Sequence, residues 1–225
     1  FPAFLFCAAG LAGAQEAAPP PPAEATAEAT AEAASQTPDL SRAYYHFMLA
    51  RRFKELAGIY NRSDYVERAI VEYKKAMEAD PASLFLRVEL AELYWRVSRI
   101  ADAVREAEAV LKINPDQDDA HRLLAHLYWR NLGDARGDQV ASESLRKAIE
   151  HFEALARLNP EDVENELVLG RLYRLNNQGE KAEQVFRKVL DSHPDSKSAL
   201  THLAQLFFDQ GDYEQAIELL TKLDA

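Results

Sequence analysis

Histidine, cysteine and grouped carboxylates are the residues that most often carry catalysis or hold metals, and this chain does not space them as a site. Its six histidines stand at 46, 121, 126, 151, 193 and 202. None belongs to a His-Glu-x-x-His motif, and His121 and His126 are five apart, whereas two ligands on one helix face are three or four apart. The sequence also has no Gly-rich phosphate loop. We therefore predict no catalytic residue, no bound metal and no cofactor.

The single cysteine, Cys7, lies in an apolar opening that is typical of a secretory signal. Residues 1–14 read FPAFLFCAAGLAGA and end in Ala-Gly-Ala, the small-x-small pattern of a cleavage site. We predict an N-terminally truncated signal peptide and an exported protein, periplasmic or secreted. An uncleaved membrane anchor stays open, because the apolar segment starts without a methionine.

Residues 15–38 are almost entirely alanine, glutamate, proline and threonine. Such a segment has no large apolar side chains whose burial could offset the entropy cost of ordering it. We predict a disordered linker there and a folded domain over residues 39–225.

The chain is acidic, with 37 Asp and Glu residues against 26 Lys and Arg, and its net charge is -11. Nucleic acids and anionic lipid surfaces bind through basic patches, so this balance argues against both as partners. Protein or peptide partners fit the composition better.

Any binding residues must be positioned by helices, because residues of the same type recur at a fixed spacing along the domain. Prolines stand at 81, 115, 160 and 194, alanines at 69, 103, 148, 182 and 216, and aromatics at 60, 94, 128, 173 and 207. The gaps are 34 residues, apart from one of 45 in each series. A constant period of this length indicates repeated helical hairpins. The copies span about 50–83, 84–117, 118–162, 163–196 and 197–225.

The repeat resembles the tetratricopeptide repeat, whose signature runs Leu-Gly-x2-Tyr, then Ala-x3-Phe, then Pro. The fourth copy matches it best, with Leu169-Gly170-x2-Tyr173, Ala182-x3-Phe186 and Pro194. The resemblance implies an all-α fold, a right-handed superhelical solenoid of about five hairpins with a concave groove. The small residues at the Gly170 position let the two helices of a hairpin approach closely.

Two copies depart from the pattern. The third carries 11 extra residues, for which we predict a polar Gly/Asp loop within 131–144, either a tolerated insertion or a contact loop beside the groove. The fifth ends on an apolar helix face without a polar capping helix, although solenoids need one for solubility. We expect this face to be covered by further chain, or by end-to-end self-association through the fifth repeat.

The tetrapeptide Leu-Tyr-Trp-Arg occurs at 93–96 and again at 127–130. Its leucine and tyrosine belong to the signature, so their recurrence indicates only fold. The resemblance implies that free positions on the first helix of each hairpin face the groove, among them the two that follow the tyrosine. It thereby predicts a partner-binding groove lined by Arg51, Lys54, Arg62, Trp95, Arg96, Arg122, His126, Trp129, Arg130, Arg171, Arg174 and Phe208.

Tryptophan and arginine are the residues that most often dominate binding interfaces. A groove that combines them suits an extended peptide or helix with carboxylates or apolar anchors. Some family members clamp the acidic C-termini of chaperones with Lys, Asn, Asn, Lys and Arg. Lys54 matches the first place, but Gly58, Glu89, Asp119 and Leu123 occupy the others, so we predict no such clamp.

The sequence favours a protein-protein interaction scaffold or assembly adaptor that is not an enzyme. Two alternatives stay open. The chain could be the substrate-recognition module of a larger enzyme whose catalytic domain lies beyond Ala225, or a structural spacer that associates end to end.

Overall fold

The computed structural model describes residues 37–134 and 138–223. The expected signal peptide at 1–14 and nearly all of the expected linker at 15–38 lie outside these residues. The chain divides at Pro38 into two units, and the second, Asp39–Ala225, holds all the described helices.

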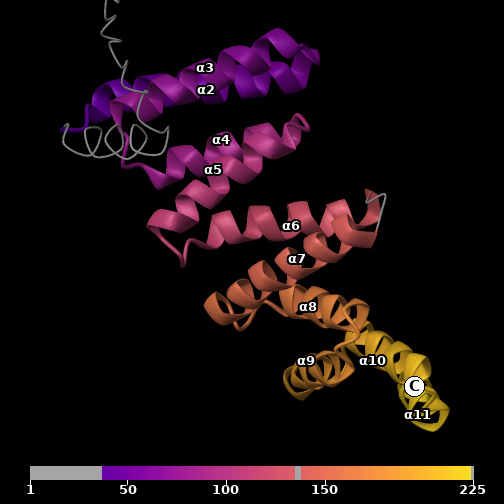
Figure 1. The fold of residues 1–225 in the computed structure, drawn as a ribbon. Coiled ribbons are helices and arrows are strands. Elements are labelled where there is room, and N and C mark those ends of the chain that lie inside the picture. Colours follow the sequence, from indigo (N-terminus) through magenta and orange to yellow (C-terminus); the bar gives the residue numbers. More distant parts are fainter. Residues whose placement is uncertain (1–36, 135–137, 224–225) are drawn as a thin grey trace, which may run out of the picture. The chain divides into compact units, whose positions relative to one another are not determined.

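The described residues form helices and no strand, and the helices follow one another as antiparallel pairs (Figure 1). Each pair packs its second helix on the first helix of the next pair. The pairs are α2 (Leu40–Tyr60) with α3 (Ser63–Ala79), α4 (Leu84–Arg96) with α5 (Ile100–Ile113), α6 (Asp118–Asp134) with α7 (Asp138–Leu158), α8 (Val163–Leu175) with α9 (Gly179–Ser192), and α10 (Lys197–Gln210) with α11 (Tyr213–Leu223).

The turns that follow the second helices share one construction. Helix α3 ends where the amide of Asp80 donates to the carbonyl of Ala76 at 2.9 Å, and Asn114, Asn159 and His193 make the same bond after α5, α7 and α9. A proline follows each of these residues and cannot continue the helix, because it has no N–H to donate. The period of 34 residues is therefore the distance between two such helix ends.

Small residues set the distance between the two helices of a pair. A Cβ atom added to Gly170 on α8 would lie 2.5 Å from Cε1 of Phe186 on α9, so only glycine fits there. Phe186 is fully buried. In the second pair both positions are alanine, and Ala91 and Ala107 are also fully buried. In the fourth pair, the large residue on one helix is thus matched by a small one on the other.

The prediction of a loop within 131–144 is wrong for the described part of that segment, because residues 131–134 and 138–144 are helical and residues 135–137 lie outside the described ranges. Helix α6 is four residues longer than α4, and α7 is seven residues longer than α5, so the 11 extra residues lengthen the two helices. The side-chain amide of Asn131 donates a hydrogen bond to Ser144 Oγ at 2.9 Å and so connects the two helix extensions. Lengthening an existing helix avoids the cost of nucleating a new one, and this outweighs the turn preference of glycine and aspartate.

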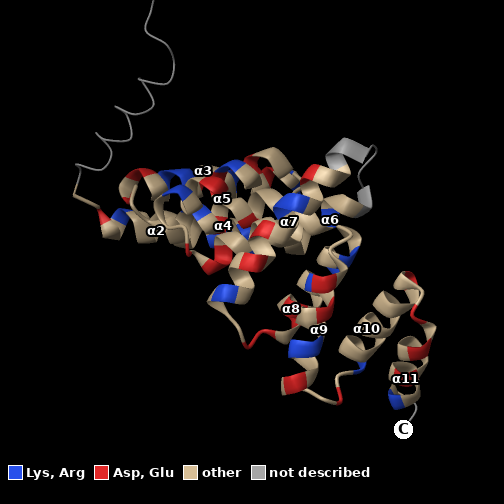
Figure 2. Cartoon of the chain, turned by 60° about the horizontal axis from the view of Figure 1, so that its bottom comes forward, with Lys and Arg blue, Asp and Glu red and all other residues tan. Residues whose placement is uncertain are grey.

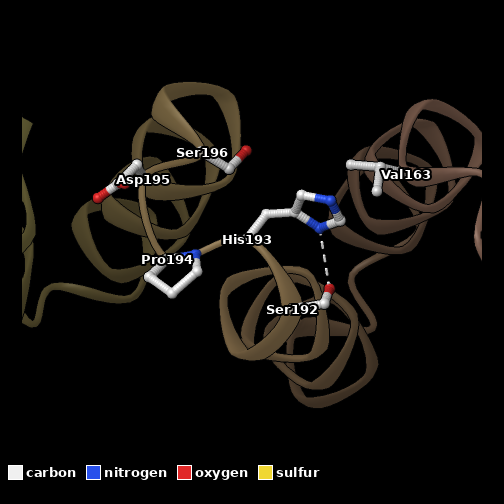
Figure 3. Close-up of a pocket in the computed structure, with 6 residues that line it drawn as sticks. All are labelled: Val163, Ser192, His193, Pro194, Asp195 and Ser196. Carbon is white, nitrogen blue, oxygen red and sulfur yellow. Dashed lines mark hydrogen bonds between the residues drawn. The ribbon is translucent and has the colours of Figure 1, made fainter.

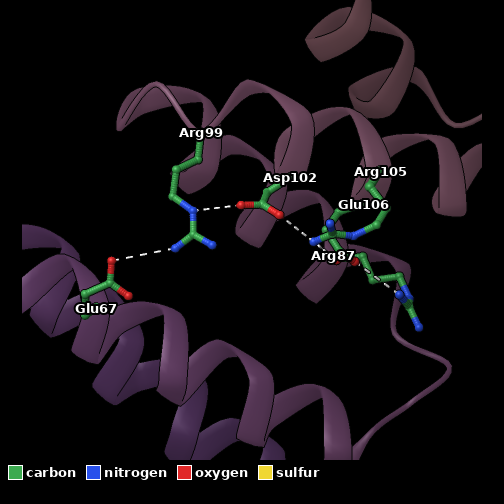
Figure 4. Close-up of polar contacts among 6 residues, drawn as sticks. All are labelled: Glu67, Arg87, Arg99, Asp102, Arg105 and Glu106. Atoms are coloured by element: carbon green, nitrogen blue, oxygen red, sulfur yellow. Dashed lines mark hydrogen bonds and ion pairs between the residues drawn. The ribbon is translucent and has the colours of Figure 1, made fainter.

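Charged residues link the first two pairs at their surface (Figure 4). Arg99, the residue before α5, lies 3.6 Å from Glu67 on α3 and 2.7 Å from Asp102 on α5. Arg87 on α4 lies 3.3 Å from Glu106 on α5, and this pair is partly buried. Exposed ion pairs such as Arg99–Glu67 contribute little to stability, so the fold is held mainly by its apolar core.

Candidate functional site

The candidate residues that follow the signature aromatics lie on successive first helices. We call these residues, Trp95, Arg96, Trp129, Arg130, Arg174 and Phe208, together with Arg171, which stands three residues before Arg174, the first-helix row; they come from α4, α6, α8 and α10. Its members meet across repeat junctions: Trp95 with Arg130 around one hollow, Trp129 with Arg171 as a ring and cation, and Arg174 with Asp209 of α10 as an ion pair. At two junctions, neighbouring first helices therefore bring members of the row close together, and binding of a partner by the row stays a prediction.

The hollow between α4 and α6 has a volume of about 220 Å³. Leu127, Ile100 and the half-buried indole of Trp95 supply apolar walls, and Arg130 and Asn131 supply polar groups at its edge. Arg130 is exposed and makes no ion pair with any described residue. The hollow thus combines an apolar surface with a guanidinium that is free to bind a carboxylate.

The second tryptophan is already engaged. The guanidinium of Arg171 on α8 lies 4.9 Å from the centroid of the Trp129 ring on α6. Both side chains are partly buried, and Trp129, like Trp95, also packs against the core. A cation over an indole face is an attractive contact, so Trp129 contributes to the junction between the third and fourth repeats.

Several of the candidate cations are neutralised within the fold. Lys54 lies 3.1 Å from Glu89, whose same oxygen accepts a hydrogen bond from the Tyr73 hydroxyl at 2.8 Å. Arg122 lies 2.9 Å from Asp118 and 3.6 Å from Asp162, and Arg174 lies 2.5 Å from Asp209. These three cations are therefore less available to a partner than Arg96 and Arg130.

Glu89 shows how closely one of these pairs is held. Burial alone would raise the pKa of its carboxyl, but the hydrogen bonds from Tyr73 and Lys54 outweigh burial and hold the pKa below its usual value. Burial and the hydrogen bond to Glu89 in turn raise the pKa of Tyr73. In the chaperone clamp, the position of Glu89 would hold an asparagine. In this chain Glu89 forms an ion pair with Lys54 instead.

The remaining candidates sit at the margins of the row. The guanidinium of Arg51 lies 5.9 Å from the Phe47 ring centroid, and His126 stands edge-on to Phe152 with centroids 5.7 Å apart. Burial, followed by the charge of Arg122, lowers the pKa of His126. Phe208 is exposed and stands edge-on to Tyr213, with centroids 5.4 Å apart.

Arg62 departs from the row. Helix α2 ends at Tyr60, two residues before the corresponding point of α4, and Asn61 takes a left-handed conformation with φ of 48°. Arg62 therefore lies in the turn, where its guanidinium binds Asp64 at 2.9 Å. Counting from the signature tyrosine could not reveal this, because the count assumes equal helix lengths.

The structure also pairs two histidines that lie on different helices. His121 on α6 and His151 on α7 are buried, and their Nδ1 atoms are 3.1 Å apart. His121 Nε2 lies 2.8 Å from the Pro115 carbonyl, which can only accept. With a single ring proton, His121 donates through Nε2 and accepts at Nδ1 from His151. No spacing rule within one helix predicts this pairing.

A further hollow, of about 560 Å³, lies where α9 turns into α10 (Figure 3). Its lining includes His193, whose ring nitrogen is 3.0 Å from the Ser192 hydroxyl, and Pro194. Within the described ranges, no three His, Cys, Asp or Glu side chains gather as metal ligands would. None of the described helices is both long and apolar enough to span a membrane.

Two family models match parts of the chain. One, described as a tetratricopeptide repeat, matches residues 66–129, and the other, described as anaphase-promoting complex, cyclosome, subunit 3, matches residues 141–223. No curated protein matches the sequence.

Solved structures of similar fold include a crystal structure of a MamA protein, with a TM-score of 0.63 and 16% sequence identity over 81% of this chain and 90% of that chain. MamA from Desulfovibrio magneticus RS-1, from residue 41 to its end, has a TM-score of 0.58 and 19% identity over 77% of this chain and 92% of that chain. Likeness at such identities concerns the fold. The expectation of an all-α solenoid of helical hairpins is confirmed.

Proposed function

Since this chain is a tetratricopeptide-repeat protein, we propose that it is a scaffold that binds a segment of a partner protein along the first-helix row. Tetratricopeptide repeats commonly mediate protein–protein interaction and are generally non-catalytic. The hollow between Trp95 and Arg130 is the proposed main anchor. It would take an apolar side chain that stands next to a carboxylate in the partner.

The observation that carries this proposal is the contrast between the two tryptophans. Trp129 is covered by Arg171, whereas Trp95 borders a hollow whose guanidinium, Arg130, has no ion pair among the described residues. Arg96, which follows Trp95, is also exposed and without such a pair. Desolvated Trp and Arg residues commonly account for most of the binding energy of an interface.

The charge of the whole chain limits the partner further. With a net charge of -11, the protein repels a strongly acidic partner at long range, so a partner carrying one or two carboxylates within a neutral or basic segment fits best. We also propose, from residues 1–14, that the encounter takes place after export.

The test is a pull-down from the native organism followed by a binding measurement with the recovered segment. The Trp95→Ala/Arg130→Ala variant is compared with the parent and with Ile113→Ala/Arg146→Ala, which removes one exposed apolar residue and one exposed arginine away from the row. We expect at least tenfold weaker binding for the first variant only. Far-UV circular dichroism checks that all three proteins are helical.

Equal affinity of the two variants would refute the proposed anchor. Single variants separate the apolar part of the hollow from the charged part. Trp95→Ala alone keeps the carboxylate contact and should weaken binding at every salt concentration. Arg130→Ala alone should also remove much of the salt dependence, because it deletes the charged contact.

A further inference from the structure

Both ends of the helical stack expose residue positions that every internal repeat buries. At the first end, Ile59 and Tyr60 on α2 are 68% and 60% exposed. The residues at the same two positions of the later repeats are all buried: Leu93 and Tyr94, Leu127 and Tyr128, Leu172 and Tyr173, and Leu206 and Phe207.

At the other end of the stack, helix α11 exposes apolar residues of its own. Leu220 on α11 is 49% exposed, and Ile217 is 64% exposed. The residues at the position of Leu220 in the four earlier repeats are fully buried, namely Tyr73, Ala107, Phe152 and Phe186. In the internal repeats such positions are covered because the second helix of one pair packs on the first helix of the next.

The internal junctions define the register of that packing. Glu153 on α7 accepts a hydrogen bond from the Tyr173 hydroxyl of α8 at 2.6 Å, and Arg187 on α9 lies 5.9 Å from the ring centroid of Phe207 on α10. Glu153 and Arg187 each stand five residues after the repeated alanine. On α11 the same position is Thr221, and it faces no later aromatic residue in the described chain.

Helix α11 and the α2 end therefore present the two halves of one junction. We propose that a second copy of this chain packs its helix α2 on α11, with Tyr60 of the second copy against Thr221. The association is head to tail, in the register that the chain already uses between its own repeats. This surface is separate from the first-helix row and does not depend on what the row binds.

Charge favours a second copy in this orientation. Helix α2 carries four basic residues, Arg42, Arg51, Arg52 and Lys54, of which Lys54 is already paired with Glu89, and one acidic residue, Glu55. Helix α11 carries two acidic residues, Glu214 and Glu218, and one basic residue, Lys222. Figure 2 shows these charges on the ribbon. Pairing α2 with α2, or α11 with α11, would bring like charges together, whereas head-to-tail pairing joins opposite ones.

Arg52 fits the same arrangement. Its equivalents in the later repeats, Leu86, Ala120, Asn165 and Ala199, are buried, and Ala120 packs on Val110, near the C-terminal end of α5. In the proposed contact, Arg52 would therefore lie near the C-terminal end of α11. The free carbonyls of a helix C-terminus attract a cation, so an arginine is favourable there.

A head-to-tail contact joins two different surfaces, so an open chain of copies keeps one free end of each kind. The test measures mass by sedimentation velocity from about 1 to 200 μM, a range that brackets weak self-association. We expect the mass of the parent chain to rise beyond the dimer. Ile59→Glu blocks the α2 end and Leu220→Glu the α11 end, and each variant alone should stay monomeric.

An equimolar mixture of the two blocked variants is decisive. Each keeps one functional end, so the mixture should form a heterodimer and nothing larger. Ile113→Glu, which replaces an exposed residue away from both ends, should associate like the parent. Circular dichroism and thermal unfolding check that both blocked variants fold.

A monomeric parent at 200 μM, or association that survives both substitutions, would overturn the proposal. The second result would point to residues 1–38, which all variants share. The Trp95→Ala/Arg130→Ala variant should associate like the parent, so loss of partner binding and loss of self-association are separate outcomes.

Discussion

The guanidinium of Arg171 lies 4.9 Å from the centre of the Trp129 ring and joins α8 to α6 across a repeat junction. The other tryptophan, Trp95, occupies the same repeat position one period earlier, but it has no such partner among the described residues and borders a hollow. The two copies of Leu-Tyr-Trp-Arg therefore serve different ends. One tryptophan supports the stack, and the other is open to a ligand.

A double-mutant cycle on Trp129→Leu and Arg171→Met should give a coupling energy of about 0.5–1 kcal/mol, the range for a partly exposed cation–π contact. Urea unfolding at 25 °C measures the free energy of unfolding of the parent, of each single variant and of the double variant. A second cycle on Trp95→Leu and Arg171→Met, two residues that make no cation–π contact within the described ranges, should give a coupling energy near zero. Equal couplings would mean that the ring contact contributes nothing specific.

Replacing Glu89 by leucine should cost on the order of 2–3 kcal/mol, because it leaves the Tyr73 hydroxyl and the Lys54 ammonium without their shared acceptor. Glu89→Gln keeps an acceptor and should cost about 1 kcal/mol. Glu55→Gln, at an exposed ion pair with Arg52, should change stability by less than about 0.5 kcal/mol. Denaturant unfolding measures the loss of stability in each of the three variants. We expect the largest loss for Glu89→Leu, a smaller one for Glu89→Gln and the smallest for Glu55→Gln, and any other order would contradict the role given to Glu89.

Gly170→Ala should destabilise the protein by about 1–3 kcal/mol, although alanine is the better helix former by about 1 kcal/mol. The added Cβ would lie 2.5 Å from the Phe186 ring, which is fully buried and cannot move aside cheaply. Combining it with Phe186→Leu should recover part of the loss. Gly58→Ala, where a Cβ meets nothing within 4 Å, should be neutral or stabilising and serves as the matched control.

The buried histidine pair should make the protein sensitive to acid. Burial, followed by the charges of His121 and Lys147, lowers the pKa of His151 to about 4. The unfolded chain takes up a proton near pH 6.5 and the folded chain only near pH 4, so stability should fall as the pH drops between these values. One pKa unit corresponds to about 1.4 kcal/mol, so the loss is on the order of 3 kcal/mol.

Urea unfolding between pH 7 and pH 4.5 measures this slope directly. His151→Gln removes the titrating group and should flatten the slope. His193→Asn, at an exposed turn residue, should leave it as in the parent. A parent slope that survives His151→Gln would assign the acid sensitivity to other groups.

The hairpins could be predicted from the sequence because their positions depend on contacts that recur at a fixed spacing. Gly170 opposes Phe186, and the equivalent positions of the second repeat are the buried Ala91 and Ala107, so buried residues recur at matching places in the repeats. The extra residues of the third repeat could not be placed in this way. Their composition indicates a turn, but the adjoining helices extend into them, and Asn131 and Ser144 bond across the extensions.

The period, the helical class and the recurring residues follow from the amino-acid sequence alone, because burial within a hairpin requires the same residue types every 34 positions. What each free position does depends on how the helices pack in three dimensions. Arg171 lies over the Trp129 ring, Glu89 forms an ion pair with Lys54, and His121 lies against His151. The sequence does not reveal these contacts, because they join helices whose relative rotation no single repeat specifies. The same rotation leaves Trp95 and Arg130 at one open hollow, and places the exposed halves of a repeat junction on α2 and α11.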